Sequence, residues 1–237
     1  MLKVALGAGH GINSAGKRCM KSIDPGETRE WWLNDRVCDY IERYLSDYDG
    51  YELLRLDDSD DGEENVPLAE RVGEANKWGA DVYLSVHHNA GINGGGGGGI
   101  VCYTHPHSSK ESVLWRDALY DALVARTGLK GNRSDPKTTE NYYVLRETKM
   151  PAVLLELGFM DSTTDVPIIL TEEHAEGCAR AIVETLVERG GLTKKEALPG
   201  TLYRVQVGAF VERDNAERLM EELQEKGYKP FIVQEAK

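Results

Sequence analysis

Two histidines and two glutamates of this 237-residue chain stand where their chemistry would matter. Glu156 is embedded in the apolar, strand-like run 154–159, where an ionised carboxylate is costly unless it is paired, protonated or close to a metal. His10 ends one strand-like run, His87 ends another, and Glu30 lies at the start of a helical segment. Two imidazoles and a carboxylate form a ligand set that suits zinc. These residues therefore predict a zinc site with Glu156 beside it.

The residues alone leave other interpretations open. His10 could be an ordinary loop histidine, because ligands at 10, 30 and 87 lack the short spacing of zinc fingers and of the H-E-x-x-H motif. Glu27 and Glu30 could both serve only as favourable charges in the first turn of a helix. Glu156 could be a buried carboxylate with a purely structural partner. Spacing by itself therefore does not select a metal site.

Alternating β-like runs and helical stretches indicate an α/β fold, with a central mixed, mostly parallel sheet flanked by helices. Strands are expected near 3–8, 51–56, 82–87, 99–104, 142–146 and 152–158. Helices are expected over 29–48, from Pro67 to about 78, from Ser108 or Ser109 to 127, and after a cap at Thr171. The ends of the first, third and sixth strands should meet at one edge of the sheet, where open α/β sheets usually place their sites. That edge would bring His10, His87 and Glu156 together.

Five motifs occur in order along roughly residues 1–190. They are GHG at 9–11, E-x-x-x-N at 30–34, S-V-H-x-N-A at 85–90, V-L-R-E-T-K-M-P-A-V at 144–153 and L-E-L-G-F at 155–159. This set resembles the zinc-dependent N-acetylmuramoyl-L-alanine amidases, which are cell-wall enzymes of bacteria and of phage lysins. The resemblance implies one zinc ion per chain, peptidoglycan as the substrate, and hydrolysis of the amide between N-acetylmuramic acid and L-alanine.

The resemblance also implies a role for each site residue. His10, Glu30 and His87 would be the metal ligands, and Asn34, four residues after Glu30, favours Glu30 over Glu27. Glu156 would be the catalytic carboxylate, which takes a proton from the attacking water and returns it to the leaving L-alanine amine. Other zinc peptidases or deacylases that act on wall peptides remain an alternative. A non-catalytic wall-binding protein that kept the fold is disfavoured, because all four residues are present.

Neighbouring residues of the third strand need separate interpretation. Successive side chains of a strand point to opposite faces, so at most one of His87 and His88 can face the site. In the family pattern that residue is the first, His87, and His88 would then pack in the interior or face solvent. Asn89 could orient a ligand, although a turn-forming role is nearly as plausible.

The segment 193–200 is expected to be a linker between a catalytic domain at 1–192 and a small appendage at 201–237. The appendage has the pattern of one βαβ unit and resembles the first repeat of a SPOR domain, a peptidoglycan-binding module that in its family has two such repeats. One repeat is too small to bury a stable core alone. We therefore expect two tails to pair in a homodimer; packing on the chain's own catalytic domain and disorder are the alternatives.

Composition excludes some classes of partner. The formal net charge of −12 argues against nucleic acid, which needs a basic patch, and no apolar run approaches the length of a membrane span. The N-terminus enters strand-like sequence directly, so we expect cytoplasmic synthesis without a signal peptide and action on the wall after release, in phage or mother-cell lysis. The four scattered cysteines are expected to be reduced thiols.

Several other features are interpreted as surface. The acidic stretch 57–62 lacks the glutamate that an EF-hand loop requires and is expected to be a solvated loop. The glycine run 94–99 has no helix signature after it and is expected to be a flexible connection. His105, His107 and His174 are expected to have no special role.

Overall fold

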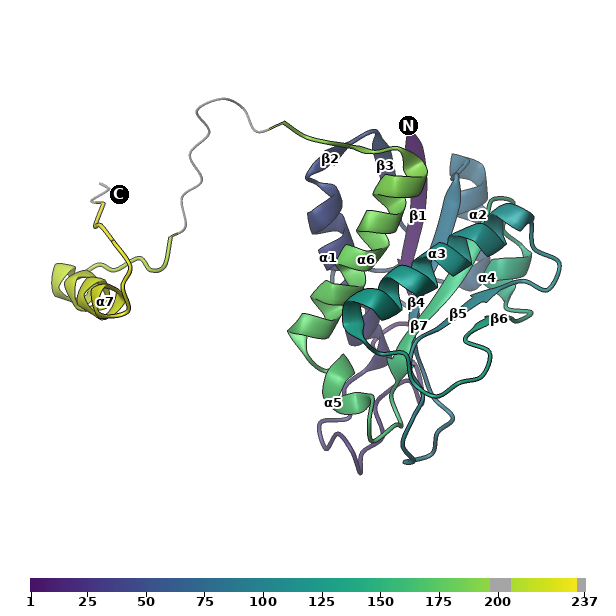
Figure 1. The fold of residues 1–237 in the computed structure, drawn as a ribbon, viewed down its shortest axis with the longest axis horizontal. Coiled ribbons are helices and arrows are strands. Elements are labelled where there is room, and N and C mark those ends of the chain that lie inside the picture. Colours follow the sequence, from purple (N-terminus) through teal and green to yellow (C-terminus); the bar gives the residue numbers. More distant parts are fainter. Residues whose placement is uncertain (197–205, 234–237) are drawn as a thin grey trace. The chain divides into compact units, whose positions relative to one another are not determined.

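The computed structural model describes residues 1–196 and 206–233 of the chain, in two compact units, Met1–Lys195 and Glu196–Lys237. The first unit contains a six-stranded sheet in the order β3-β1-β4-β7-β5-β6 (Figure 1). All neighbouring strands are parallel except β5 and β7, which are antiparallel. The predicted mixed, mostly parallel sheet is therefore confirmed. Its strands are β1 Leu2–Ala8, β3 Tyr51–Arg55, β4 Val82–Asn89, β5 Val101–Thr104, β6 Lys137–Thr139 and β7 Ala152–Phe159.

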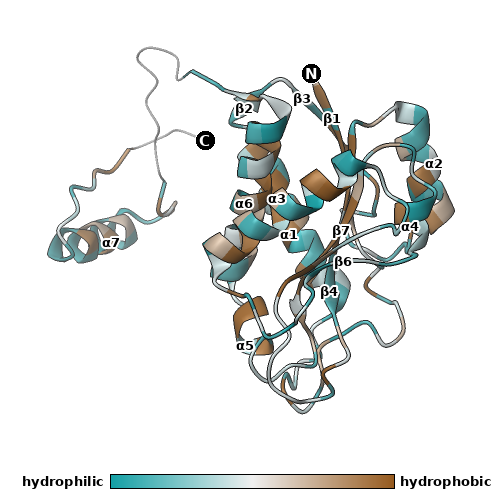
Figure 2. Cartoon of the chain, turned by 45° about the vertical axis from the view of Figure 1, so that its right-hand side comes forward, coloured by the Kyte–Doolittle hydropathy of each residue, from teal (hydrophilic) through white to brown (hydrophobic). Residues whose placement is uncertain are grey.

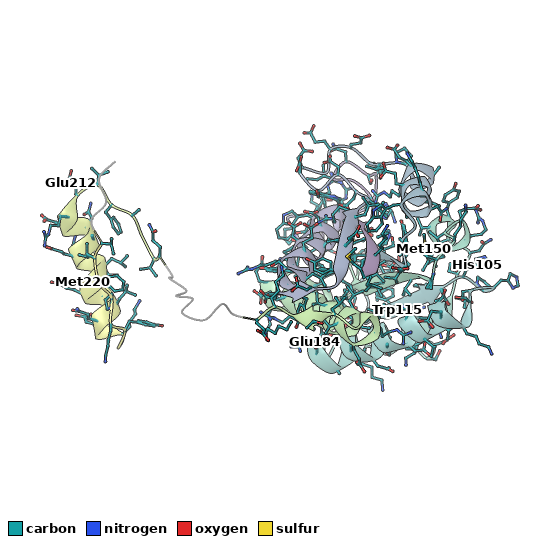
Figure 3. All side chains as sticks on the ribbon, turned by 90° about the horizontal axis from the view of Figure 1, so that it is seen from above. His105, Trp115, Met150, Glu184, Glu212 and Met220 are labelled. Carbon is teal, nitrogen blue, oxygen red and sulfur yellow. The ribbon has the colours of Figure 1, made fainter. Side chains whose placement is uncertain are left out.

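Helices cover both faces of this sheet. The larger core contains apolar residues of α1, α3 and α6 together with one face of the strands, and the smaller core contains residues of α2 and α4 with the opposite face. Figure 2 shows β1 and β7 largely in the hydrophobic colour, as expected for strands buried on both faces. In Figure 3, Trp115 of α3 and Glu184 of α6 mark helices on the same side of the sheet. The helices of this unit are α1 Glu30–Leu45, α2 Leu68–Trp78, α3 Lys110–Thr127, α4 Tyr143–Arg146, α5 Val166–Ile169 and α6 Glu172–Gly190.

Local capping explains where two of the long helices begin. The Ser109 side chain accepts a hydrogen bond from the backbone of Ser112, and the Thr171 side chain accepts one from His174, as the sequence predicts. All four cysteines are buried and free. Among the helices described, none is both long and apolar enough to cross a bilayer.

Three expectations for the first unit are wrong in detail. Residues 143–146 form the short helix α4 instead of a strand, and the consecutive residues Val144 and Leu145 both pack into the smaller core, which alternation along a strand would not allow. The edge strand β6 was not expected, since its three residues are too few to show a pattern. The first two residues of the predicted linker, Thr193–Lys194, form strand β8 and pair with β2, Tyr48–Asp49.

The glycine run is not a flexible connection. Backbone N–H groups of Gly97, Gly98 and Gly99 donate to side-chain oxygens of Thr164, Asn132 and Asp165 at 2.9, 3.0 and 2.7 Å. All three glycines have positive φ, which other residues rarely adopt. The run is therefore held in a fixed path beside the loop that follows β7.

The second unit contains α7, Arg213–Glu225, which carries Met220 (Figure 3). The strands expected on either side of it are absent from residues 206–210 and 230–233, so the predicted βαβ unit is wrong for the part of the tail that is described. The other half of its first strand, 201–205, lies outside the described residues. No residue of α7 is buried.

Candidate active site

His10, Glu30 and His87 converge at the edge of the sheet where β1 and β4 end. Their ligand atoms all lie within 4.8 Å of one another. Glu30 Oε1 is 3.3 Å from His10 Nε2 and 3.1 Å from His87 Nδ1. The side chain of Glu30 is 1% exposed, whereas those of His10 and His87 are 24% and 16% exposed. The cluster is therefore closed on the carboxylate side and open to solvent on the imidazole side.

His10 is held by its backbone. It has a φ of 68°, a left-handed conformation that is uncommon for a residue with a side chain and is often found at functional sites. The Arg71 guanidinium of α2 stabilises this turn by donating to the carbonyls of Ala8 and His10, the latter at 3.0 Å. The backbone N–H of Ala8 donates to Asp57 Oδ1 at 2.9 Å. The first residue of the acidic stretch is thus buried and structural, whereas a solvated loop was expected.

Asn34 lies one helical turn after Glu30 on α1 and positions it. Its Nδ2 donates to the Gly9 carbonyl at 3.1 Å and lies 3.5 Å from Glu30 Oε1, while its Oδ1 accepts from His88 Nδ1 at 2.8 Å. The amide thereby ties the helix to the ends of both β1 and β4. Glu27, the alternative ligand, is instead paired with the side chains of Arg18 and Lys21 at 3.1 and 3.2 Å.

His87 and His88 have different surroundings. His88 follows Val86 onto the face that α1 covers, where it is buried and bonded to Asn34. His87 lies on the other face, beside Glu30, and its Nε2 is 3.0 Å from Ser85 Oγ. Only one of the two histidines joins the cluster, as alternation along the strand predicts, and it is the first, as in the family pattern. Asn89 Oδ1 accepts from the next backbone N–H, of Ala90, which is the local turn role.

Glu156 stands beside His87 on the neighbouring strand. The two residues are Cα partners in the parallel pairing of β4 with β7, so their side chains share a face of the sheet. Glu156 is 8% exposed, and its Oε2 has no hydrogen-bond partner among the described residues. Burial and the nearby Glu30 carboxylate raise the pKa of Glu156 well above its usual range, although Lys17 opposes this shift.

The protonation states of the cluster suit metal binding. Burial opposes the ionisation of Glu30, but hydrogen bonds from His10 and His87 outweigh it and hold the pKa of Glu30 well below its usual range. Burial lowers the pKa of His87, so this imidazole is neutral at physiological pH. Ionised carboxylates and neutral imidazoles are the forms that bind metal ions.

A metal ion also fits the unsatisfied atoms of this site. Glu30 Oε2, like Glu156 Oε2, is buried without a hydrogen-bond partner in the described part of the chain, and the nearest cation, Lys17 Nζ, is 3.7 Å from it. Buried polar atoms without partners are rare and commonly mark a water or an ion. The three predicted ligands therefore form a candidate metal centre, with Glu156 beside it.

Sequence reasoning missed the residues that position this centre. The guanidinium of Arg71 gave no signal, because its partners are backbone carbonyls far away in sequence. Gly9 was noted only as part of the GHG motif, but a Cβ built on it would lie 2.1 Å from the His87 ring. Of the histidines set aside, His105 and His107 meet edge to face in an exposed loop. His174 is buried and bonded to the Leu157 carbonyl at 2.9 Å.

Comparison with known proteins gives consistent results for the first unit. The family model described as N-acetylmuramoyl-L-alanine amidase matches residues 4–188. The amidase CwlM of Bacillus licheniformis is 31% identical over 98% of this chain and 85% of its own length. The sporulation-specific amidase of Bacillus subtilis is likewise 31% identical over 98% of this chain and 85% of its own length. Among solved structures, an amidase from Clostridium difficile 630 has a TM-score of 0.68 and 26% identity, covering 79% of this chain and 95% of its own.

A SPOR domain model matches residues 179–235. This match begins inside α6, whose residues Ala181, Ile182 and Leu186 are fully buried in the larger core of the first unit. A helix face that is already packed in one core cannot cover a second sheet. Only the part of the match beyond Lys195 is therefore free to form a separate module.

Proposed function

We propose a zinc-dependent mechanism for this chain, which belongs to the N-acetylmuramoyl-L-alanine amidase family and hydrolyses the amide between N-acetylmuramic acid and L-alanine in peptidoglycan. His10, Glu30 and His87 would hold one zinc ion. When bound by three protein ligands, zinc supplies a Lewis acid that activates water and stabilises negative charge on a carbonyl oxygen. The observation that carries this proposal is the closeness of the three ligand atoms, within 4.8 Å.

Glu156 is the proton carrier in this mechanism. Its unpartnered Oε2 accepts the proton of the attacking water and then donates it to the leaving amine of L-alanine. A raised pKa favours the second step, because the carboxyl must hold the proton until the amine leaves. The charges near Glu156 are those of Glu30, which raises its pKa, and of Lys17, which lowers it.

Metal analysis and product analysis together test the proposal. The purified chain should contain about one zinc per molecule, since three ligands and an open position are the usual catalytic arrangement. Digestion of peptidoglycan followed by mass spectrometry should reveal new L-alanine amino termini and no new reducing sugars. A metal-free protein that is fully active, or the release of other termini, would overturn it.

The alternative of another zinc peptidase or deacylase is distinguished by the same digestion, because it predicts cleavage inside the stem peptide or loss of an acetyl group. The family match and the structural relatives favour the amidase. A non-catalytic wall-binding protein predicts no products at all. The presence of all four site residues argues against a non-catalytic protein.

The tail is proposed to hold the enzyme on the wall, as the SPOR match supports. Pairing of two tails stays a prediction, and it is supported by large apolar side chains that are exposed in the described part of the tail: Val207, Phe210, Val211, Tyr228, Phe231, Ile232 and Val233. Light scattering on the full chain and on a 1–195 truncation tests it, because a dimer formed through the tails must become monomeric on truncation. A full-length monomer at high concentration would eliminate it.

Release of the enzyme to the wall from the cytoplasm also stays a prediction. Fractionation of cells during lysis or sporulation tests it: the chain should stay with the cytoplasm until the membrane is opened and then appear on the wall.

A further inference from the structure

A polar cavity adjoins the catalytic carboxylate and has no part in the mechanism above. It has a volume of about 510 Å³ and is lined by Tyr103 of β5, Thr138 and Thr139 of β6 and the loop that contains Arg133. Tyr103 is paired with Leu154, two residues before Glu156 on β7, and it lies close enough for the Glu156 carboxylate to raise its pKa, after the larger effect of burial. The cavity therefore lies along the sheet edge from Glu156.

The strand order shows on which side of the candidate metal ligands this cavity lies. The candidate metal ligands lie on β1, α1 and β4, Glu156 lies on β7, and the cavity lies on β5 and β6, farther along the same sheet. In the proposed mechanism the scissile carbonyl faces the metal ligands and Glu156 protonates the leaving amine, so a peptide that continues away from the ligands runs to the β5 side of the centre. Neighbouring strands are about 5 Å apart, so the cavity on β5 and β6 lies roughly 5 to 10 Å from β7. An extended peptide advances about 3.4 Å per residue. The second and third residues of the leaving peptide reach this distance.

Arg133 is the cation of this cavity. Its guanidinium lies over the ring of Phe159, three residues after Glu156, at 5.3 Å from the ring centroid. Among residues 1–196 and 206–233, none forms an ion pair or hydrogen bond with it. Asp135 and Glu140 also line the cavity, and Glu140 Oε1 is occupied by the backbone N–H of Asn141 at 2.9 Å. In a chain of net charge −12, an arginine without a partner among the described residues, in a cavity next to the strand that carries Glu156, is available for an anionic ligand.

The glycine run holds this arginine in place. Asn132, the residue before Arg133, accepts the hydrogen bond from Gly98 at 3.0 Å. Gly131 packs so closely on the run that a Cβ there would lie 2.0 Å from the Gly98 carbonyl oxygen, and a Cβ on Gly99 would lie 2.5 Å from the Lys130 carbonyl oxygen. Two backbones approach this closely only where both lack side chains. The run therefore fixes the loop that presents Arg133 to the cavity.

We infer that Arg133 is a specificity-determining residue that binds the carboxylate of an acidic second residue in the leaving stem peptide. This inference rests on the proposed role of Glu156 in protonating the leaving amine, which sets the side on which the peptide lies. Arginine binds carboxylates through paired N–H donors, and its position over an aromatic ring leaves those donors directed to the side. The glycine run and its loop are the framework of this subsite.

Two matched substrates test the inference. One is N-acetylmuramoyl-L-alanyl-D-glutamate with the free α-carboxylate, and the other carries the α-amide in its place. Cleavage of both reports the amidase reaction, and the ratio of their kcat/KM values reports the subsite. The wild-type enzyme should prefer the carboxylate by roughly tenfold, the usual scale of a partly exposed charged hydrogen bond at a binding site. In the Arg133→Gln variant this preference should fall toward one.

Lys130→Gln is the matched control, because Lys130 is an exposed cation of the same loop that does not line the cavity. It should keep the wild-type preference, which separates a local contact from a general loss of positive charge. Circular dichroism and zinc content should be unchanged in both variants. A wild-type enzyme without a preference for the carboxylate, or an Arg133→Gln variant that keeps this preference, would overturn the inference. If the wild-type enzyme cleaves neither substrate, the assigned amidase activity is overturned instead.

Discussion

At the scale of single residues, the proposed mechanism separates metal binding from proton transfer. His10 Nε2 and His87 Nδ1 lie 3.3 and 3.1 Å from the same oxygen, Oε1 of Glu30. Glu156 lies next to this cluster because it is paired with His87 of β4. Removing one of three ligands leaves an incomplete site of much lower affinity, but removing the proton carrier leaves the ligands untouched.

The Glu156→Gln variant should therefore bind zinc normally and lose at least about two orders of magnitude in kcat, the usual contribution of a positioned acid–base group. His87→Ala should lose stoichiometric zinc, and His88→Ala should keep it, because the His88 imidazole bonds to Asn34 and does not belong to the cluster of ligand atoms. Metal analysis and turnover on wall fragments measure both effects. Zinc loss in Glu156→Gln would make this residue a ligand and refute the mechanism.

Gly9 provides a second prediction at this scale. A Cβ at Gly9 would lie 2.1 Å from the His87 ring, so Gly9→Ala must displace that imidazole from the centre. We expect the variant to lose zinc and activity while it stays folded. Gly73→Ala is the matched control, since a Cβ there meets nothing within 4 Å in helix α2 and should stabilise the protein by up to about 1 kcal/mol. Normal zinc content in Gly9→Ala would show that the turn before His10 can shift.

At the scale of elements, α2 stabilises the turn after β1 from outside the site. The Arg71 side chain is buried and donates to carbonyls of Ala8, His10 and Val66, the last two at 3.0 Å. Its charge is satisfied entirely by backbone oxygens on the described elements around it. This contact maintains the left-handed conformation of His10.

Arg71→Met should therefore weaken zinc binding and lower the free energy of unfolding by about 3 kcal/mol, because buried carbonyls lose charged donors. Lys77→Met, on the same helix with an exposed side chain, is the control and should change neither quantity measurably. Urea unfolding with and without a chelator separates the two contributions. If Arg71→Met unfolds like the wild type but binds zinc less tightly, the arginine acts on the site alone.

At the scale of the whole molecule, buried histidines make stability depend on pH. Burial lowers the pKa of His88 to about 3, and burial also lowers the pKa of His174. The unfolded chain binds these protons near pH 6.5 whereas the folded chain does not, so stability falls as pH decreases from about 6.5 toward about 3.

For His88 this linkage amounts to about 2 kcal/mol between pH 7 and pH 5 in the metal-free protein. The His88→Gln variant, which keeps an amide donor for Asn34, should show a smaller loss of stability over that range. Chemical unfolding in the presence of a chelator at the two pH values measures the difference. An equal loss in both proteins would mean that His88 is already protonated in the fold.

The sequence by itself predicted the class of fold and the sheet edge at which His10, His87 and Glu156 meet, and its resemblance to a known family suggested the roles of the four site residues. Periodicity and the five motifs sufficed for this, because hydrophobic patterning and side-chain chemistry are local properties. Alternation along the strand, which follows from backbone geometry, also limited the site to one of His87 and His88, and the family pattern selected His87.

Only the tertiary structure decided what those residues contact. The support that Arg71 gives to His10 and the packing of the glycine run against Gly131 join segments far apart in the chain, and the pairing of Glu27 with Arg18 and Lys21 depends on the path of the loop before α1. Residues 143–146 became a helix for the same reason, because the apolar residues around them set their packing. Such contacts depend on where the sheet brings distant backbones together, and no local pattern in the sequence records that position.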